Sequence, residues 1–152
     1  MTDLYNAALV ALTEANIDWR NDTIRVALLS DSVAYTPSID SEQYVADVLD
    51  GGTTAQEFTG SGYSRQTLTG VSISQDNTDD EAVVDADDVT FPTVDGDTVQ
   101  GVLVYQQVGA DDSTPGDDRL IGYYDGNDYP KAANGSDFVV EWSTEGVYNL
   151  TN

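Results

Sequence analysis

The chain has 152 residues, of which 28 are Asp or Glu and five are Lys or Arg, so its formal net charge is −23. This length suits one domain with one hydrophobic core. Cys and His are both absent, which excludes disulfides, thiolate chemistry and the commonest general base. With no basic patch in the sequence, direct binding to nucleic acid is also disfavoured.

The acidity itself indicates adaptation to high salt. Most of the acids are Asp, Lys131 is the only lysine, and the acids are spread along the chain rather than gathered in a tail. In dilute buffer such a charge destabilises a compact state by self-repulsion. At molar salt the Debye length falls to about 3 Å and the repulsion is screened. We therefore expect a protein of a salt-accumulating cell, or of a virus that infects one.

The first predicted element is a helix over residues 1–16. Apolar residues recur there at three- and four-residue spacing, which indicates one apolar face: Leu4, Tyr5, Ala8, Leu9 and Leu12. Thr2 or Asp3 is expected to cap the helix, which should end near Asn16. The apolar stripe is expected to pack on the domain's own sheet. In an assembling protein it would instead contact a neighbour.

Most of the remaining chain shows β-strand patterns. We expect about eight strands, with segments at residues 23–29, 63–68, 71–74, 82–85, 88–91, 99–108, 120–124, 138–142 and 146–150. Segment 23–29 is expected to be a central strand, 99–108 has the strongest β pattern, and the last two are expected to form a terminal hairpin. A short helix is predicted over residues 41–49, capped by Ser41 and stopped by Gly51 and Gly52. Residues 75–81 and 110–118 are expected to be solvated loops.

These elements predict a mainly β fold. Strands joined by short turns, without repeated βαβ units, favour an antiparallel β-sandwich or jelly-roll-like barrel with an N-terminal α-helix and one short internal helix. Residues 1–152 are expected to form a single β-sandwich domain, with helix 1–16 packed on it. No apolar run approaches the roughly 18 residues that span a membrane. The N-terminus lacks the basic region of a signal peptide, so we expect synthesis in the cytoplasm.

The sequence shows no catalytic motif. Lys131 lies in a loop-like stretch without a Ser-x-x-Lys pattern or a nucleophile elbow around it. Pairs of carboxylates are compatible with glycoside hydrolysis, but a chain with 28 acids always offers such pairs. We therefore expect no enzyme, and we predict no catalytic or cofactor-binding residues.

Three acidic clusters are candidate sites for Ca²⁺ or Mg²⁺. They are Asp76 with Asp79, Asp80 and Glu81, then Asp85 with Asp87 and Asp88, then Asp125 with Asn127 and Asp128. The third comes closest to a tight loop of oxygen ligands. None matches the twelve-residue calcium loop. We expect solvated loops at all three, and we predict no metal ligands and no cofactor.

The order of several segments resembles a family of small proteins encoded among the structural genes of tailed phages and haloarchaeal tailed viruses. The resemblance covers most of the chain and rests on order and spacing, because the individual motifs are ordinary β segments. The segments are Leu4 to Leu12, Asp22 to Leu29 with Tyr35-Thr36-Pro37, Gly62 to Leu68, Asp85 to Phe91, Val102 to Tyr105, Arg119 to Asp125 and Phe138 to Trp142. The acidic loops at 75–81 and 110–118 look like elaborations of this pattern.

The resemblance implies a virion structural protein, in particular a capsid decoration or turret protein of a haloarchaeal tailed virus. Its implied partners are the major capsid protein and further copies of itself as a cyclic homo-oligomer. It carries over no catalytic residues. A tail or neck component remains an alternative. So does a receptor- or carbohydrate-binding β module, in which Trp19, Trp142, Tyr123 and Tyr124 would line the site.

Overall fold

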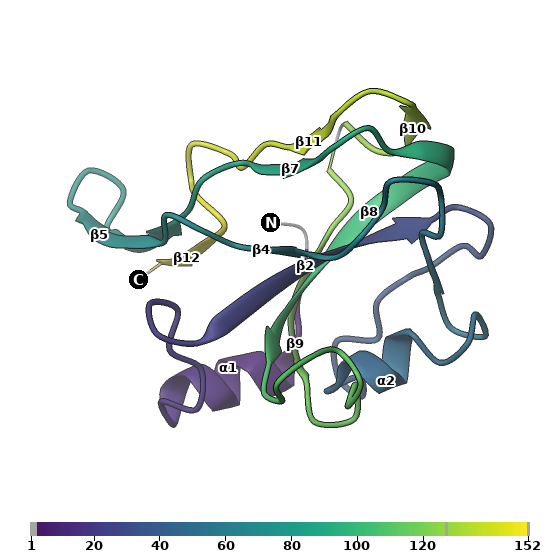
Figure 1. Ribbon diagram of the computed structural model, residues 1–152. Coiled ribbons are helices and arrows are strands. Elements are labelled where there is room, and N and C mark those ends of the chain that lie inside the picture. Colours follow the sequence, from purple (N-terminus) through teal and green to yellow (C-terminus); the bar gives the residue numbers. More distant parts are fainter. Residues whose placement is uncertain (1–2, 127, 152) are drawn as a thin grey trace.

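The computed structural model describes residues 3–126 and 128–151, which form twelve strands and two helices (Figure 1). Every strand pair is antiparallel. This confirms the expected mainly β, sandwich-like fold with an N-terminal helix and a short internal one. The strands outnumber the expected eight because several are only two to four residues long.

The main sheet has seven strands. Its central order is β1 (Asp3–Leu4), β9 (Arg119–Tyr124), β8 (Asp95–Gln107), β2 (Thr23–Ser30) and β3 (Gln56–Glu57), while β10 (Lys131–Asn134) pairs with β8 and β4 (Gln66–Thr67) pairs with β2. The long strands β2 and β8 are paired from Thr23 opposite Gln107 to Ser30 opposite Val99. They form the structural axis of the domain.

Two small sheets accompany the main one. The first pairs β7 (Val89–Phe91) with β11 (Phe138–Val140), and the second has the order β12 (Tyr148–Thr151), β6 (Glu81–Asp85), β5 (Ser72–Asp76). In Figure 1, β7 and β11 lie above β2 and β8, while helices α1 (Asn6–Thr13) and α2 (Val45–Val48) lie below them. The long strands are therefore covered on both sides.

That double cover explains the composition of β2 and β8. Runs of consecutive residues, not alternate ones, are buried in these strands, over 26–29 and 102–105. Apolar runs of this kind are typical of strands with both faces covered. Each buried Val or Leu contributes about 1.5–3 kcal/mol relative to an exposed one, so these two strands hold the centre of the core.

The N-terminal helix is shorter than expected. It begins at Asn6, after the short strand β1, and its N-cap is Tyr5 with no capping side chain, so the expected cap at Asp3 is wrong; Thr2 lies outside the described residues. The helix ends at Thr13 because the chain turns at Ala15, which has a φ of 58°. The pairing of β1 with β9 fixes where the helix starts.

The internal helix is also shorter than the expected 41–49. It spans only Val45–Val48, and its N-terminal amides are capped by Asp47, not by Ser41. The Asp47 carboxylate accepts hydrogen bonds from the backbone N–H groups of Gln43 and Tyr44, both at 2.9 Å. The helix is therefore capped by the Asp47 carboxylate from its own first turn, and the position of Ser41 gives no sign of this.

The predicted terminal hairpin is wrong. Residues 138–140 pair with β7 and residues 148–151 pair with β6, so the two segments belong to different sheets. The loop expected around Lys131 is strand β10, paired with β8. The loop expected at 75–81 is largely a hairpin between β5 and β6, with only residues 77–80 in its turn. None of the described helices is long and apolar enough to cross a bilayer.

Candidate functional site

Helix α1 leaves part of its apolar surface in contact with solvent. Tyr5, Ala8 and Ala11 are buried, whereas Leu9 is 39% exposed and Val10 is 57% exposed. The expected inward stripe is therefore confirmed at Tyr5 and Ala8, and at Leu4 and Leu12, which are partly buried against the core, but it is wrong for Leu9. Single exposed apolar side chains are common, but here Val10 lines two hollows and Leu9 lines one of them.

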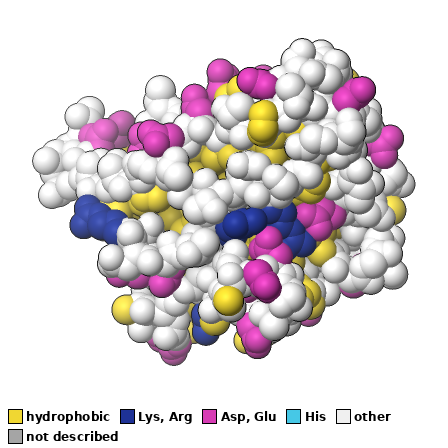
Figure 2. All heavy atoms as spheres, viewed as in Figure 1, with side chains coloured by type: hydrophobic (Ala, Val, Ile, Leu, Met, Phe, Trp, Pro, Cys, Tyr) yellow, Lys and Arg dark blue, Asp and Glu magenta, His cyan; other side chains and the backbone are white. Residues whose placement is uncertain are grey.

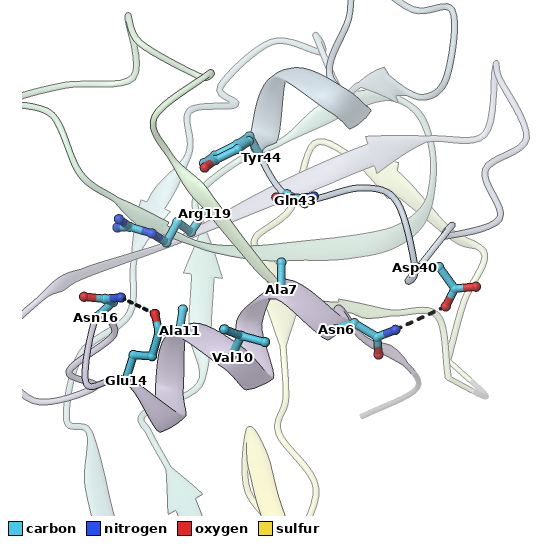
Figure 3. Close-up of a pocket in the computed structure, with 10 residues that line it drawn as sticks. All are labelled: Asn6, Ala7, Val10, Ala11, Glu14, Asn16, Asp40, Gln43, Tyr44 and Arg119. Carbon is cyan, nitrogen blue, oxygen red and sulfur yellow. Dashed lines mark hydrogen bonds between the residues drawn. The ribbon is translucent and has the colours of Figure 1, made fainter.

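A groove of about 350 Å³ runs beside this exposed surface (Figure 3). Ala7 and Ala11 point from α1 toward its opposite wall, which includes Tyr44 and Arg119. We call this feature the α1 groove, lined by Asn6, Ala7, Val10, Ala11, Glu14, Asn16, Asp40, Gln43, Tyr44 and Arg119. A second hollow of about 300 Å³ lies around Leu9, Val10, Thr13 and Glu14. Val10 and Glu14 line both.

Hydrogen bonds hold the opposite wall of the α1 groove in place. The Leu120 N–H donates to the Gln43 carbonyl at 3.0 Å, and Tyr44 forms an antiparallel bridge with Arg119. The Arg119 guanidinium donates through Nη1 to Gln106 Oε1 at 2.9 Å. Because this wall is fixed to β9 and β8, the groove is preformed and needs no partner to shape it.

The rim of the α1 groove carries charges of both signs. Arg119, one of only five cations in the chain, shares the groove with the carboxylates of Glu14 and Asp40. Asn16 donates to Glu14 at 2.9 Å, and Asn6 donates to Asp40 at 3.2 Å (Figure 3). An apolar centre with a polar, mixed-charge rim is the usual anatomy of a protein–protein contact.

A second concentration of polar side chains surrounds Arg65. Its Nε and Nη2 donate to the two carboxylate oxygens of Glu57 at 2.7 and 2.8 Å, and its Nη1 donates to the Tyr105 hydroxyl at 3.0 Å. Tyr105 donates to Asp112 Oδ1 at 2.5 Å, and Arg25 Nη2 donates to Asp112 Oδ2 at 3.0 Å. Basic and acidic side chains likewise meet near the middle of the face drawn in Figure 2.

The Arg65 network serves the protein's own structure. Its charged groups are directed at one another, and Asp112 belongs to the 108–118 loop, which the two arginines tie to the main sheet. Burial, together with the hydrogen bond to Asp112, raises the pKa of Tyr105, so its hydroxyl stays a donor. The hollows beside α1 and the hollow at the β5–β6 turn are lined by other residues than those of this network.

The first acidic cluster forms the turn between β5 and β6. Asp76 Oδ1 accepts hydrogen bonds from the backbone N–H groups of Thr78 at 2.7 Å and Asp79 at 3.3 Å. These bonds lower the pKa of Asp76, because they stabilise its ionised form. The carboxylate thus satisfies the turn's own amides.

The side chains of the second cluster are directed at different partners. Asp87 accepts a hydrogen bond from Thr69 Oγ1 at 3.3 Å, while Asp88 accepts one from the backbone N–H of Trp142 at 3.1 Å. The third cluster includes Asn127, which lies outside the described residues. Over the part of the chain that the structure describes, no group of three or more acidic side chains is placed to hold a metal ion.

Among the described residues, three carboxyls are buried, those of Glu42, Glu81 and Asp118. Glu42 Oε2 accepts hydrogen bonds from the Tyr35 hydroxyl at 2.7 Å and from the Ser38 N–H at 2.9 Å. Asp118 Oδ1 accepts a hydrogen bond from the Val108 N–H at 2.9 Å, and its Oδ2 is buried without a partner. Burial raises the pKa of Asp118. Glu81 accepts a hydrogen bond from Asn149 at 2.7 Å through Oε2, while its Oε1 is buried without a partner.

The aromatic residues considered for a carbohydrate site do not form an exposed platform. Trp19, Tyr123 and Tyr124 are buried, and Trp19 stacks on Tyr148 inside the domain. Trp142 is half-buried, packs edge-on against Tyr124 and donates through Nε1 to the Asp87 carbonyl at 3.0 Å. These residues are packed as core aromatics.

The sequence did not single out the residues that form the α1 groove. Its walls come from residues 6–16, 40–44 and 119, which only the fold brings together. The one available signal was the scarcity of cations, which makes any arginine such as Arg119 noteworthy.

Comparison with known proteins assigns no family to the chain. No protein-family model matches it, and no curated protein matches its sequence.

Proposed function

We propose that the protein is a structural subunit of a haloarchaeal tailed-virus particle, specifically a capsid decoration or turret protein. It is made in the host cytoplasm and resides in the virion, where it binds the major capsid protein and further copies of itself. The role is non-catalytic and needs neither a cofactor nor nucleic acid. The viral context is drawn from the resemblance of the ordered segments to structural proteins of tailed viruses.

The observation that carries an assembly role is the exposed apolar surface of α1 beside a preformed groove. Residues 4–13 contain no charged side chain, in a chain whose net charge is −23. Exposing the apolar side chains of Leu9 and Val10 to concentrated salt is unfavourable in free energy, and covering them with another protein is favourable.

The alternatives differ in where the protein sits. A tail or neck component would use the same kind of surface in far fewer copies. A carbohydrate-binding module is less well supported, because the aromatics that would stack on a sugar are packed inside the domain.

The deciding experiment is quantitative mass spectrometry of purified virions, which measures the copy number of this chain relative to the major capsid protein. We expect a copy number in the hundreds, or a multiple that fits the icosahedral vertices. A handful of copies would move the protein to the neck or tail. Its absence from purified particles would overturn the proposal.

A further inference from the structure

We infer that the α1 groove and the exposed α1 side chains beside it are the contact between two copies of this chain, related by a two-fold axis. The inference deepens the proposed function by naming the partner at this surface. It rests on the proposed function in one respect, which is that a capsid shell protein acts as an oligomer. Three properties of the surface lead to it.

The first property is that this surface carries both a protrusion and a hollow. Among the large apolar side chains that the structure describes, Val10 is the most exposed, and it lines both the α1 groove and the neighbouring hollow. The small residues Ala7 and Ala11 point into the groove beside it from the α1 wall. A two-fold contact requires a self-complementary patch. In such a dimer, the Val10 side chain of each copy packs toward the apolar hollow of the other copy.

The second property is the distribution of charge. Two chains of charge −23 repel each other, so they associate best where their surfaces carry least charge. The uncharged residues 4–13 provide such a place. Among the described residues, the other exposed large apolar side chains are Tyr44, which lines the groove, and Ile73, Val108 and Leu150. Ile73 and Leu150 belong to the sheet of β5, β6 and β12, and the hollow beside Leu150 is lined by Asp76, Asp80 and Glu81, so that surface is strongly acidic.

The third property is the mixed sign of the rim. Arg119 lies on one side of the α1 groove, and Glu14 and Asp40 lie on α1 and in the segment before α2. A two-fold axis through this surface places the two rims against each other so that they run in opposite directions. Arg119 of one copy then faces an acidic side chain of the second copy. This favours the two-fold arrangement over one in which the two rims run in the same direction.

The test uses the isolated chain in molar KCl. Size-exclusion chromatography with light scattering at about 100 μM is expected to give twice the chain mass of 16.3 kDa. The Val10→Glu variant should raise the dimer dissociation constant about tenfold or more, because it places a charge at the centre of an apolar contact.

The matched control is Leu150→Glu. Leu150 is 56% exposed, close to the 57% of Val10, but lies outside the groove, so the dimer should persist. Circular dichroism in the same buffer checks that both variants are folded.

A disulfide cross-link tests the two-fold geometry directly. The chain has no cysteine, so a single Val10→Cys substitution introduces the only thiol. Because Val10 lines both the α1 groove and the neighbouring hollow, a two-fold axis between them brings the two introduced thiols close together, and an added oxidant such as diamide should link them into a covalent dimer, whereas Leu150→Cys should not be linked. A wild-type chain that is monomeric or trimeric, or a dimer that survives Val10→Glu, would overturn the inference. None of these results depends on virion copy number, so the inference and the proposed function can fail separately.

Discussion

Arg65 illustrates how much structure a single cation organises in this chain. Its side chain is only 13% exposed and binds both oxygens of Glu57, while Nη1 reaches Tyr105 and lies 3.4 Å from Asp112 Oδ1. A planar guanidinium can make these contacts at once because its donors form a rigid fork. A lysine ammonium cannot reproduce this geometry, although it keeps the charge.

We therefore predict that Arg65→Lys lowers the free energy of unfolding by about 1–3 kcal/mol. Urea denaturation at constant molar KCl measures this. The matched control is Arg20→Lys, because Arg20 is exposed and donates one hydrogen bond, to the Ile73 carbonyl at 3.3 Å. That change should cost less than about 0.5 kcal/mol. Equal costs for the two variants would show that charge alone, and not the bidentate geometry, matters at Arg65.

Glu81 makes stability depend on pH. Burial, followed by the neighbouring carboxyl groups of Glu145 and Asp79, raises its pKa above the ordinary value of 4.5. A carboxyl whose pKa is higher in the folded chain than in the unfolded one binds more protons when folded. Its contribution to stability is thus fully present below pH 4.5 and is lost as the pH rises through the raised pKa.

Glu81→Gln should remove this dependence. Gln is neutral at every pH and can still accept the hydrogen bond from Asn149. We expect the variant to melt at a higher temperature than wild type at pH 7, with the difference shrinking toward pH 4. Melting curves by circular dichroism across that range are the measurement. Glu145→Gln should reduce the effect from the other side of the pair. A difference that stays constant with pH would refute the assignment to Glu81.

Strand β8 depends on one glycine where two elements approach closely. A Cβ added at Gly101 would lie 2.6 Å from Cε2 of Tyr123, whose ring is buried and packs edge-on against Tyr35 with centroids 5.0 Å apart. The ring has little space to move. We predict that Gly101→Ala costs about 1–3 kcal/mol in unfolding free energy, through overpacking.

The control for Gly101 is Gly116→Ala, because a Cβ at Gly116 meets nothing within 4 Å. Its stability should stay within about 0.5 kcal/mol of wild type. The two variants are compared by urea denaturation. A Gly101→Ala protein as stable as the Gly116→Ala control would mean that Tyr123 repacks without cost.

The elements also show which parts of the fold the sequence could predict. The apolar runs of β2 and β8 were recognisable because burial on both faces selects β-branched and apolar residues at every position. Pairing partners were not, because a strand's pattern does not name its neighbour, and so the expected terminal hairpin proved to be parts of two sheets. Strand β10 escaped notice because Lys, Ala and Asn are poor strand formers. It exists because β8 offers it an edge.

The candidate site was less predictable than the fold. The stripe on α1 was visible in the spacing, but periodicity alone could not separate the buried Ala8 from the exposed Leu9. Which of these two side chains is buried depends on the orientation of α1, which follows from the pairing of β1 with β9. The opposite wall combines Gln43 and Tyr44 with Arg119, which lies 75 positions or more later in the chain, and α1 lies more than 100 positions before Arg119. Only tertiary structure brings such segments together.

The whole molecule is dominated by uncompensated negative charge. The ion pairs with basic side chains involve the carboxylates of Glu57 and Asp112, whereas the chain has 28 acids and five bases. Figure 2 shows acidic side chains over much of the face that it draws. The remaining carboxylates therefore repel one another, and this repulsion weakens only as salt shortens the Debye length.

The fold should accordingly require salt. We predict that the melting temperature falls by about 10 °C or more between molar KCl and dilute buffer, because the self-repulsion amounts to a few kcal/mol in a domain of this size. Circular dichroism melting over a KCl series measures the drop.

A triple variant, Asp79→Asn with Asp80→Asn and Asp117→Asn, removes three exposed charges and should flatten the salt dependence while retaining the β spectrum. Asn also suits Asp80, whose φ of 56° lies in the left-handed region. If wild type melts at the same temperature throughout the series, or if the triple variant has an unchanged salt slope, electrostatic screening is not what stabilises the protein in salt.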